Sequence, residues 1–327
     1  MVTAMMGIMV CPPNSRTSEN RGFAIQGLMV LFELMKRLLL FCGIVSFNLF
    51  AGTQDPVGDL FSYDRSAPLG VVINATEVRA DAEVVDLEFF SQEERVKAFL
   101  VRPSRPKGPC AAILYVHWLG EPEKSNRSQF LDEALELAGR NVISLLVEAP
   151  WSRPNWYQER IPEEDYANSV RQVIAQRRAM DLLLTQGGVD SSRVAIVAHD
   201  FGAMYAMLAE AIDKRARTYV FMAPTPHFAD WFLFARQPEK PEAYKAQISS
   251  IDPVLFIGRL SPAPILFQFA SKDFYVSAEE AAEFTDAVKG PKEVRSYDTE
   301  HHLRVPQARA DRITWLVREL NLPQSAQ

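Results

Sequence analysis

Short apolar runs alternate with longer amphipathic segments along most of this 327-residue chain. Continuous apolar runs are typical of strands that are buried on both faces of a parallel sheet. The runs expected to form such strands are 111–116, 142–147, 194–198, 217–222 and 264–270, and the more polar segment 292–297 is expected to be the last strand. Helical patterns lie between and after them, at 127–140, 163–186, 277–288 and 306–320. This alternation predicts an α/β fold with a mostly parallel central sheet that is flanked by helices.

Three regions depart from the alternating pattern. Residues 83–90 and 95–101 alternate apolar and polar positions, which predicts an antiparallel pair of strands. Residues 54–82 are polar with few periodic features, and we expect a surface arm there. Residues 224–262 are rich in proline and aromatic residues but too few for a large cap domain, so we expect a small lid. One domain over 83–323 would carry this lid.

The N-terminal region has the pattern of an export signal. Met35, Lys36 and Arg37 precede the apolar run LLLFCGIVSFNLFAG, with small residues near Gly52. We therefore expect residues 1–53 to be an N-terminal extension and a signal peptide starting at about Met35. The mature protein would be secreted or periplasmic, with no stable membrane insertion. The alternative is a membrane anchor, although charged residues interrupt the apolar span and the run after them is short for crossing a bilayer.

Composition excludes several classes of function. The chain has 48% hydrophobic and 23% charged residues and a net charge of -6, with no basic stripe, which argues against a nucleic-acid partner. Only Cys110 would remain after signal cleavage, and a single cysteine forms no internal disulfide. Because no H-x-H or H-E-x-x-H spacing occurs, we expect neither a metal nor a cofactor. A small-molecule substrate is the expected partner, and the sequence leaves the oligomeric state open.

The segment 194–207 has the strand–turn–helix pattern of a nucleophile elbow. A buried strand leads to HDFG at 199–202, and an Ala- and Met-rich helix follows. The spacing of the G-x-S-x-G motif is kept, but Asp200 takes the serine position. The stretch resembles the α/β-hydrolase superfamily, and H-D-[FW]-G is similar to its epoxide-hydrolase and dehalogenase branch. This resemblance implies that Asp200 is a nucleophile.

Two later residues complete the order that is expected of the superfamily. Asp200, Asp273 and His301 each follow a predicted strand, in the order nucleophile, acid, histidine. Over roughly residues 83–320 the layout is most similar to dienelactone-hydrolase and acetyl-xylan-esterase-like members. That resemblance implies His301 as the catalytic histidine, with His302 as the alternative. Parallel strands end at one edge of the sheet, so we expect the three side chains to converge there.

Chemistry at an aspartate differs from chemistry at a serine. A carboxylate is already ionised, so it needs no base to displace a halide or to open an epoxide. His301 would then deprotonate the water that attacks the resulting ester, with Asp273 holding the imidazole. Attack of Asp200 on an ordinary ester would form an anhydride, which is a poor route. Asp200 acting as a base toward water therefore stays open as an alternative.

Backbone amides and loop residues supply the rest of the expected site. The turn 117–120 follows a buried strand, and family members use this loop for the oxyanion hole. We therefore expect hole amides from Trp118 or Leu119, and one from Phe201. The remaining pocket candidates are His117, His199, Trp151 and Tyr157. Candidate proton donors for epoxide opening are Tyr157, Tyr244 and Tyr275.

A non-catalytic protein remains the competing interpretation. An aspartate at a strand-to-helix turn often serves as a helix N-cap, and a lone His pair is usually exposed to solvent. The chain could have kept the hydrolase scaffold and a ligand pocket while losing its serine. Two classes of function are thus carried forward, a hydrolase for esters, epoxides or halides and a ligand-binding protein without turnover.

Overall fold

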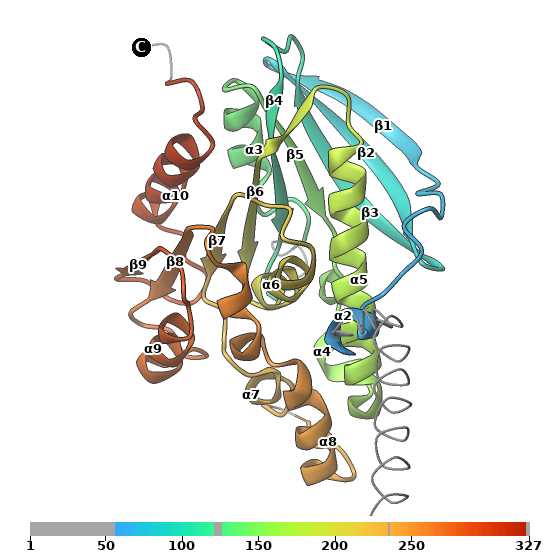
Figure 1. Cartoon of the computed structure of the whole chain (residues 1–327), viewed down its shortest axis with the longest axis vertical. Coiled ribbons are helices and arrows are strands. Elements are labelled where there is room, and N and C mark those ends of the chain that lie inside the picture. The colour runs from blue at the N-terminus through green and yellow to red at the C-terminus, as the bar shows by residue number, and fades with distance from the viewer. Residues whose placement is uncertain (1–55, 121–125, 235, 325–327) are drawn as a thin grey trace, which may run out of the picture. The chain divides into compact units, whose positions relative to one another are not determined.

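The computed structural model describes residues 56–120, 126–234 and 236–324. In these ranges nine strands form one sheet in the order β1-β2-β3-β5-β4-β6-β7-β8-β9 (Figure 1). The predicted signal peptide at 1–53 lies outside the described residues. Within the described ranges, no helix has the length and apolar character that crossing a bilayer requires.

The sheet is antiparallel at one end and parallel in the remainder. The antiparallel strands are β1 (Val72–Arg79), β2 (Ala82–Ser91) and β3 (Glu94–Pro103), and β3 also pairs antiparallel with β5. The parallel strands are β4 (Cys110–Val116), β5 (Val142–Val147), β6 (Val189–His199), β7 (Thr218–Met222), β8 (Ile265–Ala270) and β9 (Lys292–Tyr297). This arrangement confirms the predicted mostly parallel α/β sheet.

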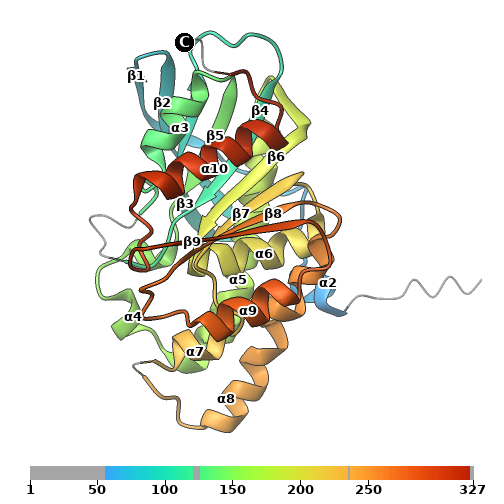
Figure 2. The same cartoon turned by 90° about the vertical axis from the view of Figure 1, so that its left-hand side faces the viewer.

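Helices cover both faces of the sheet. The α-helices are α2 (Pro56–Leu60), α3 (Leu131–Ala138), α4 (Trp156–Glu159), α5 (Asp165–Leu184), α6 (Phe201–Asp213), α7 (Phe228–Phe232), α8 (Pro241–Ile248), α9 (Ala278–Asp286) and α10 (Pro306–Glu319). Short 3-10 helices span Pro150–Ser152, Pro162–Glu164, Ser249–Ile251, Pro253–Leu255 and Ile257–Leu260. Helices α3 and α10 lie on one face, and α5 and α6 lie on the other (Figures 1 and 2).

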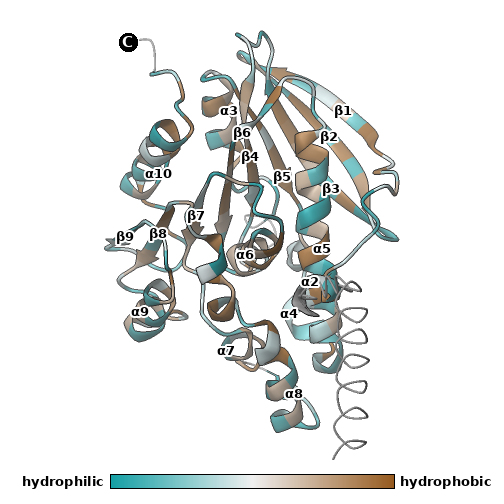
Figure 3. Ribbon diagram, viewed as in Figure 1, coloured by the Kyte–Doolittle hydropathy of each residue, from teal (hydrophilic) through white to brown (hydrophobic). Residues whose placement is uncertain are grey.

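The core follows the central strands. Every residue of β4 and β5 is buried, as expected of strands that are covered on both faces. Figure 3 shows these strands as mostly hydrophobic, while α5 and α10 carry hydrophilic bands. Removing a Leu or Ile side chain from water stabilises the fold by roughly 1.5–3 kcal/mol. Burial of the central strands is therefore the main force that holds their carboxyl ends in place.

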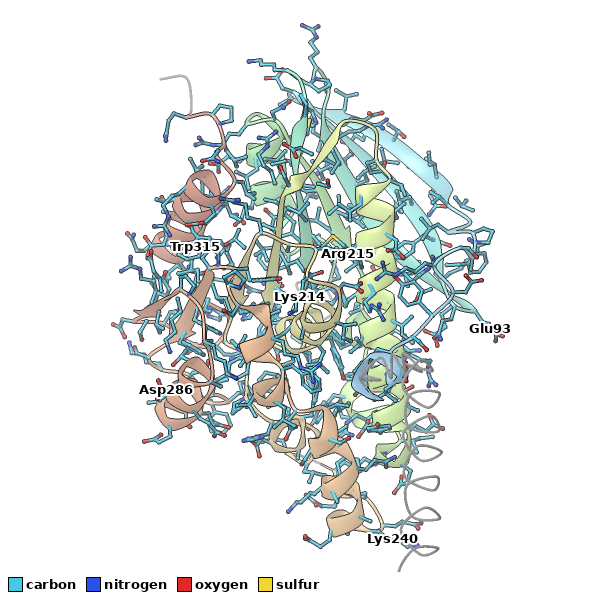
Figure 4. The ribbon with its side chains drawn as sticks, in the orientation of Figure 1. Glu93, Lys214, Arg215, Lys240, Asp286 and Trp315 are labelled. Carbon is cyan, nitrogen blue, oxygen red and sulfur yellow. The ribbon has the colours of Figure 1, made fainter. Side chains whose placement is uncertain are left out.

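Polar contacts attach the helices to the sheet and to one another. Trp315 of α10 donates its indole N–H to Thr218 Oγ1 of β7 at 2.9 Å. Between α5 and α6, Arg215 forms ion pairs with Asp181 and Asp213. Figure 4 shows where Trp315 and Arg215 lie. The Arg215 ion pairs hold the end of α6, which begins at the elbow, against α5.

The range 54–82 contains an element that its sequence did not predict. Residues of β1, Val72–Arg79, pair with β2 along the edge of the sheet. All eight residues of β1 are exposed. Neither face of the strand is buried, so the sequence lacks the period-two alternation that marks a half-buried strand. The strand extends the sheet, and Phe61 in the same range is 0% exposed and belongs to the core.

Candidate active site

Asp200 occupies a sharp turn between β6 and α6. Its backbone has φ 57° and ψ -126°, a conformation that non-glycine residues seldom adopt. Such strain is typical of positions where a side chain is held for function. Gly202 permits the turn, because a Cβ there would lie 2.6 Å from the His117 carbonyl oxygen. The strand–turn–helix prediction for this segment is confirmed.

Two backbone amides donate hydrogen bonds to the Asp200 carboxylate. Leu119 N–H donates to Oδ2 at 2.9 Å, and Phe201 N–H donates to Oδ1. The Trp118 amide instead donates to Gln129 Oε1 at 3.0 Å. Of the two amides expected from this loop, it is therefore the Leu119 amide that contacts Asp200. The two carboxylate oxygens of Asp200 thus accept from the amides that were expected to form the oxyanion hole.

His301 lies between two carboxylates. Its Nδ1 donates to Asp273 Oδ2 at 2.8 Å, and Oδ1 of that carboxylate is 3.0 Å away. Its Nε2 is 3.9 Å from Asp200 Oδ2, which is ion-pair range but longer than a hydrogen bond. Within the described residues, this buried Nε2 has no hydrogen-bond partner. The structure thus brings the three predicted side chains together.

His302 does not share this position. Its side chain is about one-third exposed, and its Nε2 lies 3.6 Å from Glu300. Its Nδ1 accepts a hydrogen bond from the Arg304 amide. Of the two candidate histidines, only His301 faces Asp200 and Asp273.

Burial and charge set the protonation states of this cluster. Burial raises the pKa of the Asp200 carboxyl to about 6, although His301 and the backbone amides partly offset that shift. Burial alone would lower the pKa of His301, but the two acidic side chains beside it, Asp200 and Asp273, raise it to about 9. Near pH 7 the Asp200 carboxylate is therefore ionised beside a His301 imidazolium.

His117 is buried but neutral. It is 1% exposed, and burial lowers its pKa to about 4. Its Nε2 accepts from the Ala149 amide at 3.0 Å, so the proton is on Nδ1, which donates to the Trp118 carbonyl at 2.9 Å. Its own carbonyl accepts from Trp151 Nε1. This histidine fixes the loop that carries the Leu119 amide.

His199 and Gln129 form a second support behind the site. Gln129 Nε2 donates to His199 Nδ1 at 2.9 Å, and His199 Nε2 donates to the His301 carbonyl at 3.1 Å. His199 is completely buried, and burial holds its pKa well below the usual range. Gln129 Oε1 also accepts from Trp118 N–H. This one side chain therefore links the loop 117–120 to His199 and, through His199, to the backbone of His301. Sequence reasoning missed Gln129, since its position between Ser128 and Phe130 carries no motif.

A cavity of about 830 Å³ opens beside this cluster. Aromatic residues dominate its wall, namely Trp118, Trp151, Trp156, Tyr157, Trp231, Phe234, Phe274 and Tyr275. Helix α7 and the residues after it supply Trp231 and Phe234, so the 224–262 segment contributes to the wall. The predicted pocket residues Trp151 and Tyr157 line it, whereas His117 and His199 lie behind it.

Three aromatic rings surround His301 at the inner end of the cavity. The ring centroids of Tyr275, Trp231 and Trp118 lie 5.2, 5.4 and 5.7 Å from that of His301. Asp200 is 0% exposed and is not part of the cavity wall. A ligand in the cavity therefore meets His301 first and reaches Asp200 only if a neighbouring side chain shifts.

The tyrosines predicted as proton donors have different surroundings. Tyr157 donates its hydroxyl to the Trp231 carbonyl. Tyr244 donates to Asp165 at 2.7 Å and does not line the cavity. Tyr275 lines the cavity beside His301. Of the three, Tyr275 is placed best to protonate a ligand.

No metal-binding arrangement is found in the described part of the chain, where groups of three or more His, Cys, Asp or Glu side chains suited to an ion are absent. Cys110, at the start of β4, is buried and unbonded to another cysteine.

Comparisons of structure show what this architecture is similar to. No protein-family model and no curated sequence matches the chain. An acetyl xylan esterase from Paenibacillus sp. R4 aligns with a TM-score of 0.67 and 18% identity, covering 81% of this chain and 92% of that one. Acetyl xylan esterase 1 from Thermoanaerobacterium sp. JW/SL YS485 gives 0.63 and 14%, covering 81% and 93%.

An S-formylglutathione hydrolase from Agrobacterium tumefaciens aligns with a TM-score of 0.59 and 14% identity, over 76% of this chain and 99% of that one. These identities are too low to transfer an activity, but the agreement in architecture extends over nearly the whole length of each neighbour. Together with the strand order and the elbow at Asp200, they identify the architecture. The chain has the α/β-hydrolase fold.

Proposed function

We propose that this protein is a hydrolase that acts on a small organic molecule through Asp200, His301 and Asp273. The observation that carries the proposal is the pair of amides, Leu119 and Phe201, bound to the Asp200 carboxylate itself. When water attacks an aspartyl ester, the oxyanion develops on the aspartate's own oxygen. Leu119 N–H holds Oδ2 and Phe201 N–H holds Oδ1, so whichever carboxylate oxygen carries the oxyanion keeps one amide donor.

The substrate class follows from the same contact. An ester substrate would need its carbonyl oxygen in the hole, which Asp200 fills. An electrophilic sp³ carbon, as in an epoxide or an alkyl halide, needs no hole in the first step. Asp200 would form the C–O bond while the C–O or C–halogen bond breaks and its electron pair leaves with the oxygen or halide. We therefore favour epoxides and halides over esters.

For an epoxide, the protonation state of His301 accounts for each proton that is transferred. The raised pKa of His301 gives an imidazolium that can protonate the alkoxide, directly or through Tyr275. Once Asp200 is an uncharged ester, the charge that favoured the imidazolium is gone, and neutral His301 can act as a base. It takes one proton from water, and the hydroxide adds to the Asp200 carbonyl carbon. Collapse of the adduct releases the diol with the other water proton and restores the carboxylate.

The distance between His301 and Asp200 fits this sequence of steps. A serine must hydrogen-bond to its base before attack, within about 2.6–3.2 Å. The 3.9 Å separation from His301 Nε2 to Asp200 Oδ2 is too long for that direct proton transfer. An ionised carboxylate does not need it, because His301 acts later and on water.

Intact-protein mass spectrometry tests the proposal. Wild type and His301→Gln are incubated with a panel of terminal epoxides and primary alkyl bromides, with turnover followed in parallel. We expect turnover in wild type and, in His301→Gln, a mass increase equal to the substrate for an epoxide, or to its alkyl group less one hydrogen for a bromide, that maps to the peptide containing Asp200. Asp200→Asn is the matched control and should gain no mass. Turnover without any adduct in His301→Gln would remove Asp200 as the nucleophile.

A second candidate function rests on a different observation. Asp200 is fully buried and each of its carboxylate oxygens accepts one backbone amide, as expected if the cluster only braces an aromatic ligand pocket. A ligand-binding protein of this kind would bind members of the panel without converting them. An Asp200→Ser variant separates the candidates further, because gained esterase activity would show that the remaining machinery works.

Export is a further part of the proposal. It rests on the sequence of residues 35–53, which the structure does not describe. Amino-terminal sequencing of the protein recovered from the extracellular or periplasmic fraction should begin near Thr53. An intact N-terminus in a membrane fraction would favour the anchor instead.

A further inference from the structure

A second cavity, of about 410 Å³, lies on the other side of the segment 149–156 from the aromatic cavity. Its wall combines the β2–β3 turn region, the end of β5 with the residues after it, and the first part of α5. It shares Arg153 and Trp156 with the aromatic cavity, and its remaining wall residues are its own. The proposed catalytic chemistry uses none of these remaining wall residues.

One polar group in this wall has no partner. Gln176 is 3% exposed, and its Oε1 accepts no hydrogen bond from the described residues. Native proteins rarely leave a buried acceptor unpaired, and doing so costs about 1–3 kcal/mol. Because Gln176 lines the cavity, a donor that enters there can satisfy it.

The cavity also carries unpaired positive charge. Its carboxylates each have an arginine within 4 Å, as Glu94 has Arg171, Glu148 has Arg127 and Asp165 has Arg160. For Lys97 and Arg153, which also line the wall, no carboxylate of the described residues lies within ion-pair distance. Arg153 donates its Nε–H to the Pro150 carbonyl at 3.3 Å, so its terminal nitrogens and the Lys97 ammonium are the groups that can meet an anion.

We propose that this second cavity binds a small hydroxylated carboxylate, with its carboxylate on Lys97 and Arg153 and a hydroxyl donating to Gln176 Oε1. The half-buried ring of Trp156 offers an apolar surface to the carbon skeleton between those groups. The volume is within the range of about 300–1,000 Å³ that is usual for small-molecule sites. Lys97 and Gln176 line this cavity alone, whereas Arg153 and Trp156 also line the aromatic cavity.

Isothermal titration calorimetry with D-gluconate tests the site. Glucose, which lacks the carboxylate, and propionate, which lacks the hydroxyls, are titrated as matched ligands. Lys97→Gln removes an exposed cation and Gln176→Leu removes the buried acceptor, while Lys107→Gln removes an exposed cation elsewhere and is the control. Thermal unfolding of each variant is measured in parallel.

We expect saturable binding of gluconate to wild type, and weaker binding of glucose and propionate. Lys97→Gln should weaken gluconate binding about tenfold or more, since a hydrogen bond to a charged group is lost, while Lys107→Gln should leave it unchanged. Gln176→Leu should weaken it as well. Absence of gluconate binding, equal binding of glucose, or unchanged binding in Lys97→Gln would overturn the proposal. Lys97→Gln keeps the test valid even if Gln176→Leu fails to fold.

Discussion

Histidines are buried on both sides of Asp200, but their pKa values shift in opposite directions. On the oxyanion side, His117 and His199 are 1% and 0% exposed and have lowered pKa values. On the acid–base side, His301 is 5% exposed and its pKa is raised to about 9. Nearly equal burial therefore does not determine the charge. The neighbouring groups determine the charge, because backbone groups and Gln129 surround His117 and His199, whereas carboxylates surround His301.

The difference in protonation state distinguishes the two supporting histidines from the histidine that is proposed to exchange protons. A neutral, buried histidine with both nitrogens engaged holds two loops at a fixed spacing, which is what His117 and His199 do. A charged, buried histidine whose Nε2 lacks a hydrogen bond is poised to exchange a proton. The residue order and the family resemblance singled out His301 as the catalytic candidate, but only the contacts distinguish the charged histidine from the two neutral ones.

The largest effect is expected from the carboxylate that His301 faces. Asp200→Asn keeps the shape of the side chain but removes the charge and the nucleophile. We expect turnover to fall by roughly 10⁴- to 10⁶-fold, as when other nucleophiles are removed. Steady-state kinetics on an accepted substrate measures it. Circular dichroism and thermal unfolding serve as controls for the elbow, and turnover within tenfold of wild type would contradict the assignment.

Removing the other carboxylate should have a somewhat smaller effect. Asp273→Asn leaves His301 without its Nδ1 partner, so the ring loses its orientation and much of the support for its charge. We expect turnover to fall by about 10³- to 10⁴-fold. Histidine NMR should show the pKa of His301 falling in the variant. An unchanged His301 pKa would show that Asp273 plays no electrostatic part.

The pH profile should follow the two raised pKa values. Asp200 attacks only as a carboxylate, so kcat/KM should fall about tenfold for each pH unit below its pKa of about 6, or about 100-fold at pH 4. With an epoxide, activity should also fall above about pH 9 as His301 loses its proton. Initial rates across pH 4–10 measure the profile. A rate that keeps rising on the acid side would mean that Asp200 is not needed in its ionised form.

The smallest effect is expected on the supporting side. Gln129→Leu removes the side chain that couples the Trp118 amide to His199, so the Leu119 amide should drift from its hydrogen bond with Asp200. Because small displacements of catalytic groups cost up to about 10²-fold, we expect roughly a tenfold loss in kcat with little change in KM. Gln129→Glu should keep part of the activity. Gln307→Leu, an exposed change on α10, is the control and should have no effect.

The sequence predicted the central sheet and the meeting of Asp200, Asp273 and His301 well. Buried strands carry a strong apolar signal, and parallel strands end at one edge whatever their surroundings. It missed β1, Val72–Arg79, because an edge strand with both faces exposed has no apolar pattern. It also missed Gln129, because a hydrogen bond across 70 residues of chain leaves no local motif.

Two site features depended on geometry that spacing cannot supply. The sequence could not choose between the Trp118 and Leu119 amides, since only their directions decide which one meets Asp200. It placed His117 and His199 in the pocket, whereas they lie behind the wall that Trp118 and Trp151 form. Candidate residues could be found from order and spacing, but their roles followed from contacts.

Oxygen labelling tests the central claim most directly. An epoxide or halide that the panel shows to be a substrate is turned over in H₂¹⁸O with enzyme in excess, and the peptide containing Asp200 is then analysed by mass spectrometry. If Asp200 is the nucleophile, water adds to its carboxyl carbon, so the peptide should gain ¹⁸O while the product of the first turnover carries none. An unlabelled Asp200 peptide together with ¹⁸O in the first product would mean that water attacks the substrate directly.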